Sequence, residues 1–216
     1  MKTISAFVFA LIFTVSFAFG QSDKYQKAME KAVAQFDTAR SAAAIQTSMN
    51  QFERIANAEK NQWLPYYYAG MCAMRMANRD DKTKIDFWAE KSDVFAAKAD
   101  SVGGDKSEVL VLKSLNALAR INVDFMSRGP QYVGQAMQLL QDARKANADN
   151  PRVPLILGQV KLSSPEGFGG DKAGGCQLIG QSLALFEKAP QGGTLPHWGK
   201  EDALRVQKKC GEMAGK

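Results

Sequence analysis

The 216-residue chain has little of the chemistry on which most enzyme active sites depend. It contains one histidine, His197, and three cysteines. The sequence places no nucleophile or carboxylate partner for His197, and no His/Cys spacing supplies the ligands of a metal site. The glycines before Asp171 are not followed by the Gly-Lys-Ser/Thr of a phosphate-binding loop. We therefore expect a protein that is not an enzyme and that uses no metal or other cofactor.

Clustered basic residues are missing as well. The formal net charge is +6 at pH 7, and the basic residues are scattered among acids. The only adjacent basic pairs are Arg144-Lys145 and Lys208-Lys209. A nucleic-acid-binding surface needs a concentrated basic patch, so the composition argues against a nucleic-acid partner.

A long apolar run occurs only near the N-terminus. Residues 4–17 are almost wholly apolar, and the small residues Ala18 and Gly20 stand at the −3 and −1 positions of a cleavage site. A run of about 14 residues is short against the roughly 20 that span a bilayer. We expect residues 1–20 to be a secretory signal peptide and residues 21–216 to be one periplasmic or secreted domain without a membrane span. The alternative is an uncleaved membrane anchor.

The alternating apolar and polar runs of β-strands are also absent. Ala, Leu, Lys, Gln, Glu and Met dominate, and apolar residues recur at helical spacing, as in Val109, Leu112, Leu115 and Leu118. Gly, Pro, Asn and Asp punctuate the chain between these stretches. The pattern predicts an all-α fold of about nine helices, near residues 23–38, 42–59, 64–78, 83–101, 106–124, 131–147, 152–162, 173–189 and 199–213.

Two segments share one order of features. Residues 57–70 and 145–158 each contain a polar turn with asparagine, a proline near the start of an apolar helix, and a glycine on that helix, Gly70 or Gly158. Small residues let two helices approach closely. The shared order indicates stacked helical hairpins, an architecture that commonly builds binding surfaces.

The paired helices resemble tetratricopeptide repeats. Ala136, Leu140 and Ala143 match the small–bulky–small spacing of that family's second helix, and Tyr66 with Gly70 matches the large-to-small spacing of its first helix. The two glycines of the shared segments lie 88 residues apart, so the usual repeat of about 34 residues is not kept. The resemblance implies a divergent, right-handed tetratricopeptide-like array of about four helical hairpins and a final helix.

More closely, the chain is similar to small exported tetratricopeptide-like proteins of Bacteroidetes. The similarity depends on the N-terminal signal peptide and on residues 63–70, 150–152, 164–171 and 196–199. It covers most of the chain after residue 20, and it implies an exported helical-repeat protein.

Two of the three cysteines are placed to pair. Gly193, in the turn before the last helix, lies equally far in sequence from Cys176 and Cys210. Residues equidistant from the turn of an antiparallel hairpin face each other, and export would supply an oxidising compartment. We expect a Cys176–Cys210 disulfide, with two buried thiols as the alternative. Cys72 is expected to be a small core residue.

The densest aromatic segment marks the expected binding surface. Three consecutive tyrosines span about 200° of a helix, so they cannot all face one core. In the family register Tyr66 packs between helices, and Tyr67 would point into a groove with Met71, Met74 and Arg75 on the same side. Met and Tyr are common at adaptable binding surfaces. These four residues are the predicted partner-binding residues; ordinary packing between helices is the alternative.

Two functions are consistent with this chain. The first is an exported, non-enzymatic binding or scaffold protein that holds an envelope protein or peptide in a groove of the helical array. The second is a small-molecule or lipid carrier whose apolar groove closes into a pocket. A large closed apolar cavity would favour the carrier, and an open groove with mixed polar lining would favour the protein partner.

Overall fold

The computed structural model describes residues 23–214, and all regular structure in this part of the chain is helical. The all-α class is therefore confirmed. The signal peptide predicted for residues 1–20 lies outside the described residues. The helices are a first helix over residues 23–38, α2 (Ala42–Ala58), α3 (Trp63–Ala77), α4 (Ile85–Ser101), α5 (Lys106–Ile121), α6 (Phe125–Ala146), α7 (Arg152–Ser163), α8 (Lys172–Phe186) and α9 (Lys200–Ala214), with short 3-10 turns at η1 (Lys82–Lys84) and η2 (Glu166–Phe168).

Polar side chains define where several of these helices begin. Ser41, Asp105, Asp124 and Asp171 precede α2, α5, α6 and α8, and each accepts a hydrogen bond from a backbone N–H of the first turn. Such a cap satisfies one of the donors that a helix start leaves unpaired, and it contributes about 1 kcal/mol. On α8 the donor is the backbone N–H of Gly174, 2.8 Å from Asp171 Oδ1.

The start of α6 differs from the prediction. The helix begins at Phe125 rather than near residue 131, so Gly129 and Pro130 lie inside it. Asp124 accepts hydrogen bonds from the backbone of Met126 and Ser127, and this cap starts the helix before the proline. Pro130 has no N–H to donate to the carbonyl of Met126, so the first turn of α6 is less firmly held than the rest.

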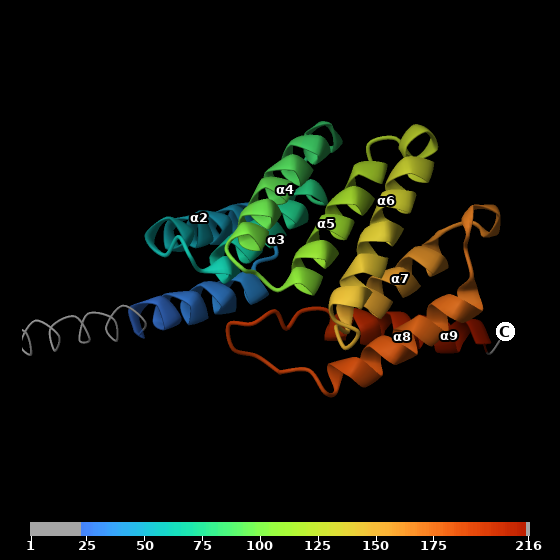
Figure 1. Ribbon diagram of the computed structural model, residues 1–216. Coiled ribbons are helices and arrows are strands. Elements are labelled where there is room, and N and C mark those ends of the chain that lie inside the picture. The colour runs from blue at the N-terminus through green and yellow to red at the C-terminus, as the bar shows by residue number, and fades with distance from the viewer. Residues whose placement is uncertain (1–22, 215–216) are drawn as a thin grey trace, which may run out of the picture.

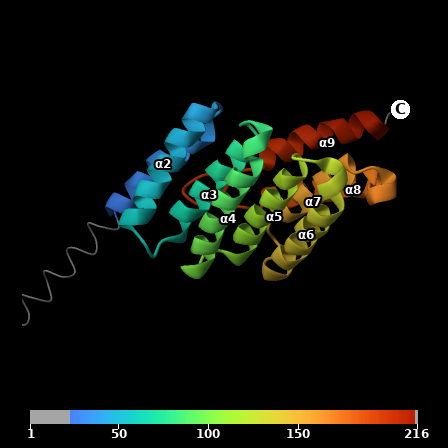
Figure 2. The same ribbon diagram turned by 90° about the horizontal axis from the view of Figure 1, so that it is seen from above.

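Successive helices pack against each other along the chain (Figure 1). Figure 2 shows α2 to α6 side by side in a row, with α9 at the C-terminal end of the molecule, near α7 and α8. The loop between α8 and α9 extends from the C-terminal end back towards α3 (Figure 1). Stacked helical neighbours fit the expected array of hairpins, while its membership of the tetratricopeptide class stays a prediction.

The glycines of the two shared segments lie where helices approach most closely. A Cβ on Gly70 would meet the side chain of Leu112 at 2.8 Å, and Ser92 donates a hydrogen bond to the Gly70 carbonyl at 2.8 Å. A Cβ on Gly158 would lie 2.9 Å from the carbonyl oxygen of Gly175 and 2.9 Å from the Ile179 side chain. The close packing inferred from the glycines is therefore present on both α3 and α7.

Two apolar cores share α5. Val109 and Leu112 belong to an N-terminal core built from the first helices to α5, whereas Val111 belongs to a C-terminal core formed with α6 to α9. Trp198, in the loop before α9, packs against both. Because α5 is buried on two sides, its position determines how the two cores meet.

A buried group of polar side chains, here called the junction network, connects these cores. Arg152 Nη1 lies 2.9 Å from Glu108 Oε1, and Tyr67 donates a hydrogen bond to Glu108 Oε2 at 2.9 Å. Asn150 donates to Glu108 Oε1 at 2.9 Å, and Trp198 Nε1 donates to the Tyr67 hydroxyl at 2.8 Å. The network thus joins α3, α5, the start of α7 and the loop before α9.

Burial dominates the titration of this network. Removal from water raises the pKa of the Glu108 carboxyl above its ordinary value, while Arg152, Tyr67 and Asn150 act in the opposite direction. Burial likewise raises the pKa of the Tyr67 hydroxyl, with the Glu108 charge adding to the effect. Tyr67 therefore acts as a hydrogen-bond donor at neutral pH.

Gly158→Ala tests the close contact between α7 and α8. We expect it to lower the free energy of unfolding by roughly 1–3 kcal/mol, because the added methyl meets a backbone carbonyl that cannot move aside easily. Gly180→Ala on α8 is the matched control: no atom lies within 4 Å of its added Cβ, and the change should be neutral or stabilising by up to about 1 kcal/mol. Urea unfolding measures both, and equal effects of the two substitutions would contradict the assigned contact.

Glu108→Gln tests the raised pKa of Glu108. Folding favours the protonated carboxyl, so its contribution to stability is fully present below the unfolded-state pKa, near 4.5, and is lost as pH rises through the higher folded-state pKa. The wild type should therefore lose stability relative to the Gln variant as pH increases from about 4.5. The variant also leaves Arg152 without its counter-charge at every pH. The informative quantity is therefore how the difference in unfolding free energy between the wild type and the variant changes with pH. Urea midpoints from pH 4 to 7 measure this change. If the wild type becomes more stable relative to the variant as pH rises over this range, the pKa of Glu108 is not raised.

Candidate functional site

An apolar groove crosses the C-terminal part of the array. Its volume is about 660 Å³, and we call it the C-terminal groove. Residues from four helices and the ends that follow them line it: Leu115, Leu118, Ile121 and Asn122 from α5; Phe125 and Val133 from α6; Ile156, Gln159, Val160, Leu162, Ser163 and Ser164 from α7; and Val206, Lys209 and Met213 from α9.

Helical periodicity explains how these side chains converge. The lining residues of α5 and α9 recur at intervals of three or four, as in Leu115 and Leu118 or Val206 and Lys209. Residues at these intervals share one face of a helix. Each helix therefore presents one apolar stripe to the groove while its other faces pack on neighbours or contact solvent.

The electrostatics of the C-terminal groove are simple. Of the described residues that line it, Lys209 alone is charged, and the lining includes no carboxylate. The remaining polar groups are neutral amides and hydroxyls, such as those of Asn122 and Gln159. Apolar walls with a few polar groups are typical of sites for small organic ligands.

A smaller apolar pocket adjoins the groove. It has a volume of about 280 Å³ and shares Phe125, Val133 and Ser164 with the groove. Phe125 is 51% exposed, and Met126, which lines the smaller pocket, is 79% exposed. Large apolar side chains left in water at the edge of a groove are typical of binding sites, because burial by a ligand would stabilise the complex.

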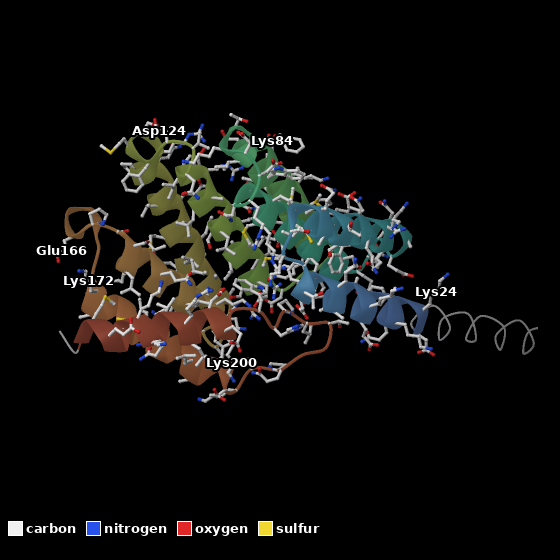
Figure 3. All side chains as sticks on the ribbon, turned by 180° about the vertical axis from the view of Figure 1, so that it is seen from behind. Lys24, Lys84, Asp124, Glu166, Lys172 and Lys200 are labelled. Atoms are coloured by element: carbon white, nitrogen blue, oxygen red, sulfur yellow. A yellow bond between two sulfur atoms is a disulfide. The ribbon has the colours of Figure 1, made fainter. Side chains whose placement is uncertain are left out.

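The first turn of α6, which carries these residues, is tied to α4. Arg128 Nη1 lies 2.7 Å from Asp86 Oδ1, and this bond lowers the pKa of the Asp86 carboxyl. Figure 3 shows Asp124, the cap of α6, and Lys84, just before α4, along the same edge of the molecule. This ion pair is partly exposed, and neither of its residues lines the groove or the smaller pocket.

The expected disulfide is present. Cys176 on α8 and Cys210 on α9 are bonded, with their Cα atoms 5.7 Å apart, and Cys72 is a buried free thiol, as expected. Cys210 lies between the groove-lining residues Lys209 and Met213. The bridge therefore holds the wall that α9 contributes to the groove.

The four predicted partner-binding residues lie elsewhere. Tyr67 is fully buried in the junction network and Met71 is buried in the N-terminal core, so the predicted orientation of Tyr67 towards a groove is wrong. Met74 is partly buried against the N-terminal core. Arg75 is partly buried against the first helix: it donates to the Phe36 carbonyl at 2.9 Å, and its guanidinium lies 3.6 Å from the centre of the Phe36 ring. Burial lowers the pKa of Arg75. Tyr67 and Met71 therefore serve packing, whereas Met74 and Arg75 keep part of their surface exposed.

Sequence reasoning did not find the C-terminal groove. It placed Val109, Leu112, Leu115 and Leu118 on one stripe, but in the structure that stripe divides: the first two enter the N-terminal core, and the last two line the groove. The signal in the sequence was the continuous apolar run at residues 109–112, because a helix with one buried face needs apolar residues only at every third or fourth position. A helix with apolar residues on several sides has more than one apolar neighbour or a ligand.

The loop before α9 crosses to the N-terminal helices and is hydrogen-bonded there. Tyr68 donates to the Leu195 carbonyl at 3.1 Å. The ring nitrogens of His197 lie 2.9 Å from the Leu195 carbonyl and 2.9 Å from Asp37 Oδ2, on the first helix. Both ring nitrogens of His197 thus have partners within the fold.

In the part of the chain that the structure describes, no group of three or more His, Cys, Asp or Glu side chains could hold a metal ion. No helix of that part combines the length and the apolar character that crossing a bilayer would require.

Comparison with known proteins gives one informative relative. No protein-family model and no curated protein matches the chain. Among solved structures, the chain is similar to the HusA haemophore from Porphyromonas gingivalis, with a TM-score of 0.80 and 29% sequence identity over 86% of this chain and 92% of that one. That protein comes from a member of the Bacteroidetes, the group whose exported proteins the sequence resembles. The likeness extends over nearly the whole array and supports a binding protein.

The Cys176–Cys210 bridge should make a large contribution to stability. Replacing both cysteines with serine should lower the free energy of unfolding by about 4 kcal/mol, because the bridge closes a 34-residue separation in the unfolded chain. Urea unfolding of the wild type, with and without reductant, measures this contribution. The double-serine variant is the control, since reductant should leave it unchanged. An unfolding free energy that is the same in the oxidised wild type and the double variant would contradict the role of the bridge.

Proposed function

We propose that this protein is an exported, non-enzymatic carrier that holds a flat, apolar ligand of the porphyrin class in the C-terminal groove. The observation that carries the proposal is the groove itself, which has apolar walls from four helices and a volume of about 660 Å³. That volume falls within the roughly 300–1,000 Å³ of pockets for organic ligands of this size.

The relative favours this ligand class over other apolar molecules. A haemophore is, by its name, a carrier of haem, and this chain is similar to one over 86% of its length. Because only about a seventh of the chain lies outside the match, the resemblance includes most of the helical array. A carrier of a flat macrocycle would use opposed helical walls to cover both faces of the ring.

The residues of the groove favour recognition of the ring over recognition of a metal at its centre. The described lining residues include no histidine, tyrosine or cysteine, the side chains that most often ligate haem iron. Met213 lines the groove and Met126 the adjoining pocket, so thioethers are the only strong soft donors at hand. Binding energy would come mainly from the apolar faces that leave water.

Export is part of the proposal. The segment predicted to direct it, residues 1–20, has the pattern of a secretory signal peptide. The Cys176–Cys210 disulfide is consistent with an oxidising compartment. A periplasmic or secreted location would place the carrier where an external ligand is first met.

A protein partner is the second candidate. Phe87 and Val94, one heptad apart on α4, are 59% and 64% exposed. Residues at this spacing share a helix face, and exposed apolar pairs of this kind occur at contact surfaces between proteins. This face is separate from the groove, so an envelope protein could bind there as well as in place of a small ligand.

Phe125→Ala tests the groove with haem and with metal-free protoporphyrin as probes. We expect the wild type to bind both with similar affinity, since the groove recognises the ring, and the variant to lose roughly tenfold for both. The loss reflects the phenyl group, whose burial contributes about 1.5–3 kcal/mol. Titration followed by porphyrin absorbance measures the dissociation constants.

Phe87→Ala is the matched control for this substitution. It removes a similarly exposed phenyl group from α4, outside the groove, and should leave both affinities unchanged. Failure of the wild type to bind either probe would reject the carrier and favour the protein partner. An equal loss in the two variants would reject the assignment to the C-terminal groove.

A further inference from the structure

Lys209 is the one charged side chain among the described residues that line the C-terminal groove. It lies on α9 between Val206 and Met213, two apolar residues of the same wall. Elsewhere on α9, Lys200 pairs with Glu187 at 3.1 Å and Arg205 with Asp202. Lys208 is exposed and does not line the groove. Within residues 23–214, no carboxylate lies within ion-pair distance of Lys209. An unpaired ammonium at the edge of an apolar site is available to an anionic group of a ligand.

The residues around Lys209 also favour its binding to an anionic group of a ligand. The lining contains no acid that would compete with a ligand for the ammonium, and its other polar groups, including Asn122 and Gln159, are uncharged. A lysine stem can lie along an apolar wall while its charged end reaches water. A carboxylate at the edge of a bound apolar ligand would then gain a charge-assisted hydrogen bond without leaving solvent entirely.

The position of Lys209 is set by the neighbouring disulfide. Cys210, the next residue, is buried and bonded to Cys176 on α8. The backbone at residue 209 is therefore held against α8, and only the side chain needs to be ordered when a ligand binds. A fixed backbone lowers the entropic cost of forming the ion pair.

We propose that Lys209 binds a carboxylate of the ligand, so that the groove selects apolar molecules bearing an acid at one edge. The inference rests on the proposed function and names the chemical feature by which that same site chooses its ligand. The acidic edge of the ligand would face α9, and its apolar edge would lie towards Phe125 and the adjoining pocket, which has no charged lining residue. Apolar walls alone discriminate weakly between ligands of similar shape, whereas a charge pair can discriminate between an acid and its ester.

The experiment compares protoporphyrin with its dimethyl ester, which keeps the ring and removes both charges. Each is titrated, in the same dilute detergent, into the wild type, Lys209→Gln and Lys208→Gln. Lys208 is the matched control, because it is an exposed lysine on the same helix that does not line the groove. We expect the wild type and K208Q to prefer the acid by about fivefold, and K209Q to bind acid and ester alike. The preference should also weaken with added salt in the wild type and not in K209Q.

The possible results separate this inference from the proposed function. If the wild type binds both compounds equally, or K209Q keeps the preference, Lys209 does not select the acid, although the groove still binds the ring. Loss of the preference in both lysine variants would indicate a general charge effect and would also overturn the assignment. If the wild type binds neither compound, the proposed function fails and this inference with it. Thermal unfolding of both variants confirms that they are folded.

Discussion

The buried ion pair between Glu108 and Arg152 is the constraint on which the rest of the array depends. Such a pair contributes little net stability compared with apolar packing, but removing one partner costs about 3–5 kcal/mol because the other charge is left in a dry interior. Any packing of the two cores that separates these side chains is therefore strongly disfavoured. The hydrogen bonds of Tyr67 and Asn150 to the same carboxylate narrow the allowed arrangements further. The network thus selects one geometry among the many that apolar contacts alone would tolerate.

That selection extends to the C-terminal groove through two helices. Glu108 is in the first turn of α5, and Arg152 is the first residue of α7. The same helices line the groove with their later residues, among them Leu118 and Val160. A rigid helix transmits the placement of one end to the other, so the ion pair also sets the separation of two groove walls. The third wall, α9, is held independently by the Cys176–Cys210 bridge. The site is therefore built on elements that are anchored outside it.

Local rules predicted the parts of this structure that depend on neighbours in sequence. The helical segments, apart from the start of α6, and the Cys176–Cys210 pairing follow from spacing and from side-chain chemistry, and they are present. Tyr67 shows where such rules end. The position of a residue in a helix gives the direction of its side chain from the helix axis. It does not show which distant segment of the chain packs against that side. Here the loop carrying Trp198 covers Tyr67 from 131 residues away. The groove was missed for the same reason, since its walls come from four helices and no single one identifies it.

The distribution of anchored and free residues bears on how the proposed carrier would bind and release its ligand. Walls held by an ion pair and a disulfide preserve the shape of the groove, so little ordering cost falls on the ligand. Release is easier if some part can move without disturbing the cores. The first turn of α6 meets that requirement, because Pro130 removes one helical hydrogen bond and Met126 is largely exposed. The Arg128–Asp86 pair that holds this turn is exposed, and such pairs contribute at most about 1 kcal/mol. Adaptability is thus confined to one edge of the groove, while the junction network keeps the remaining walls in place.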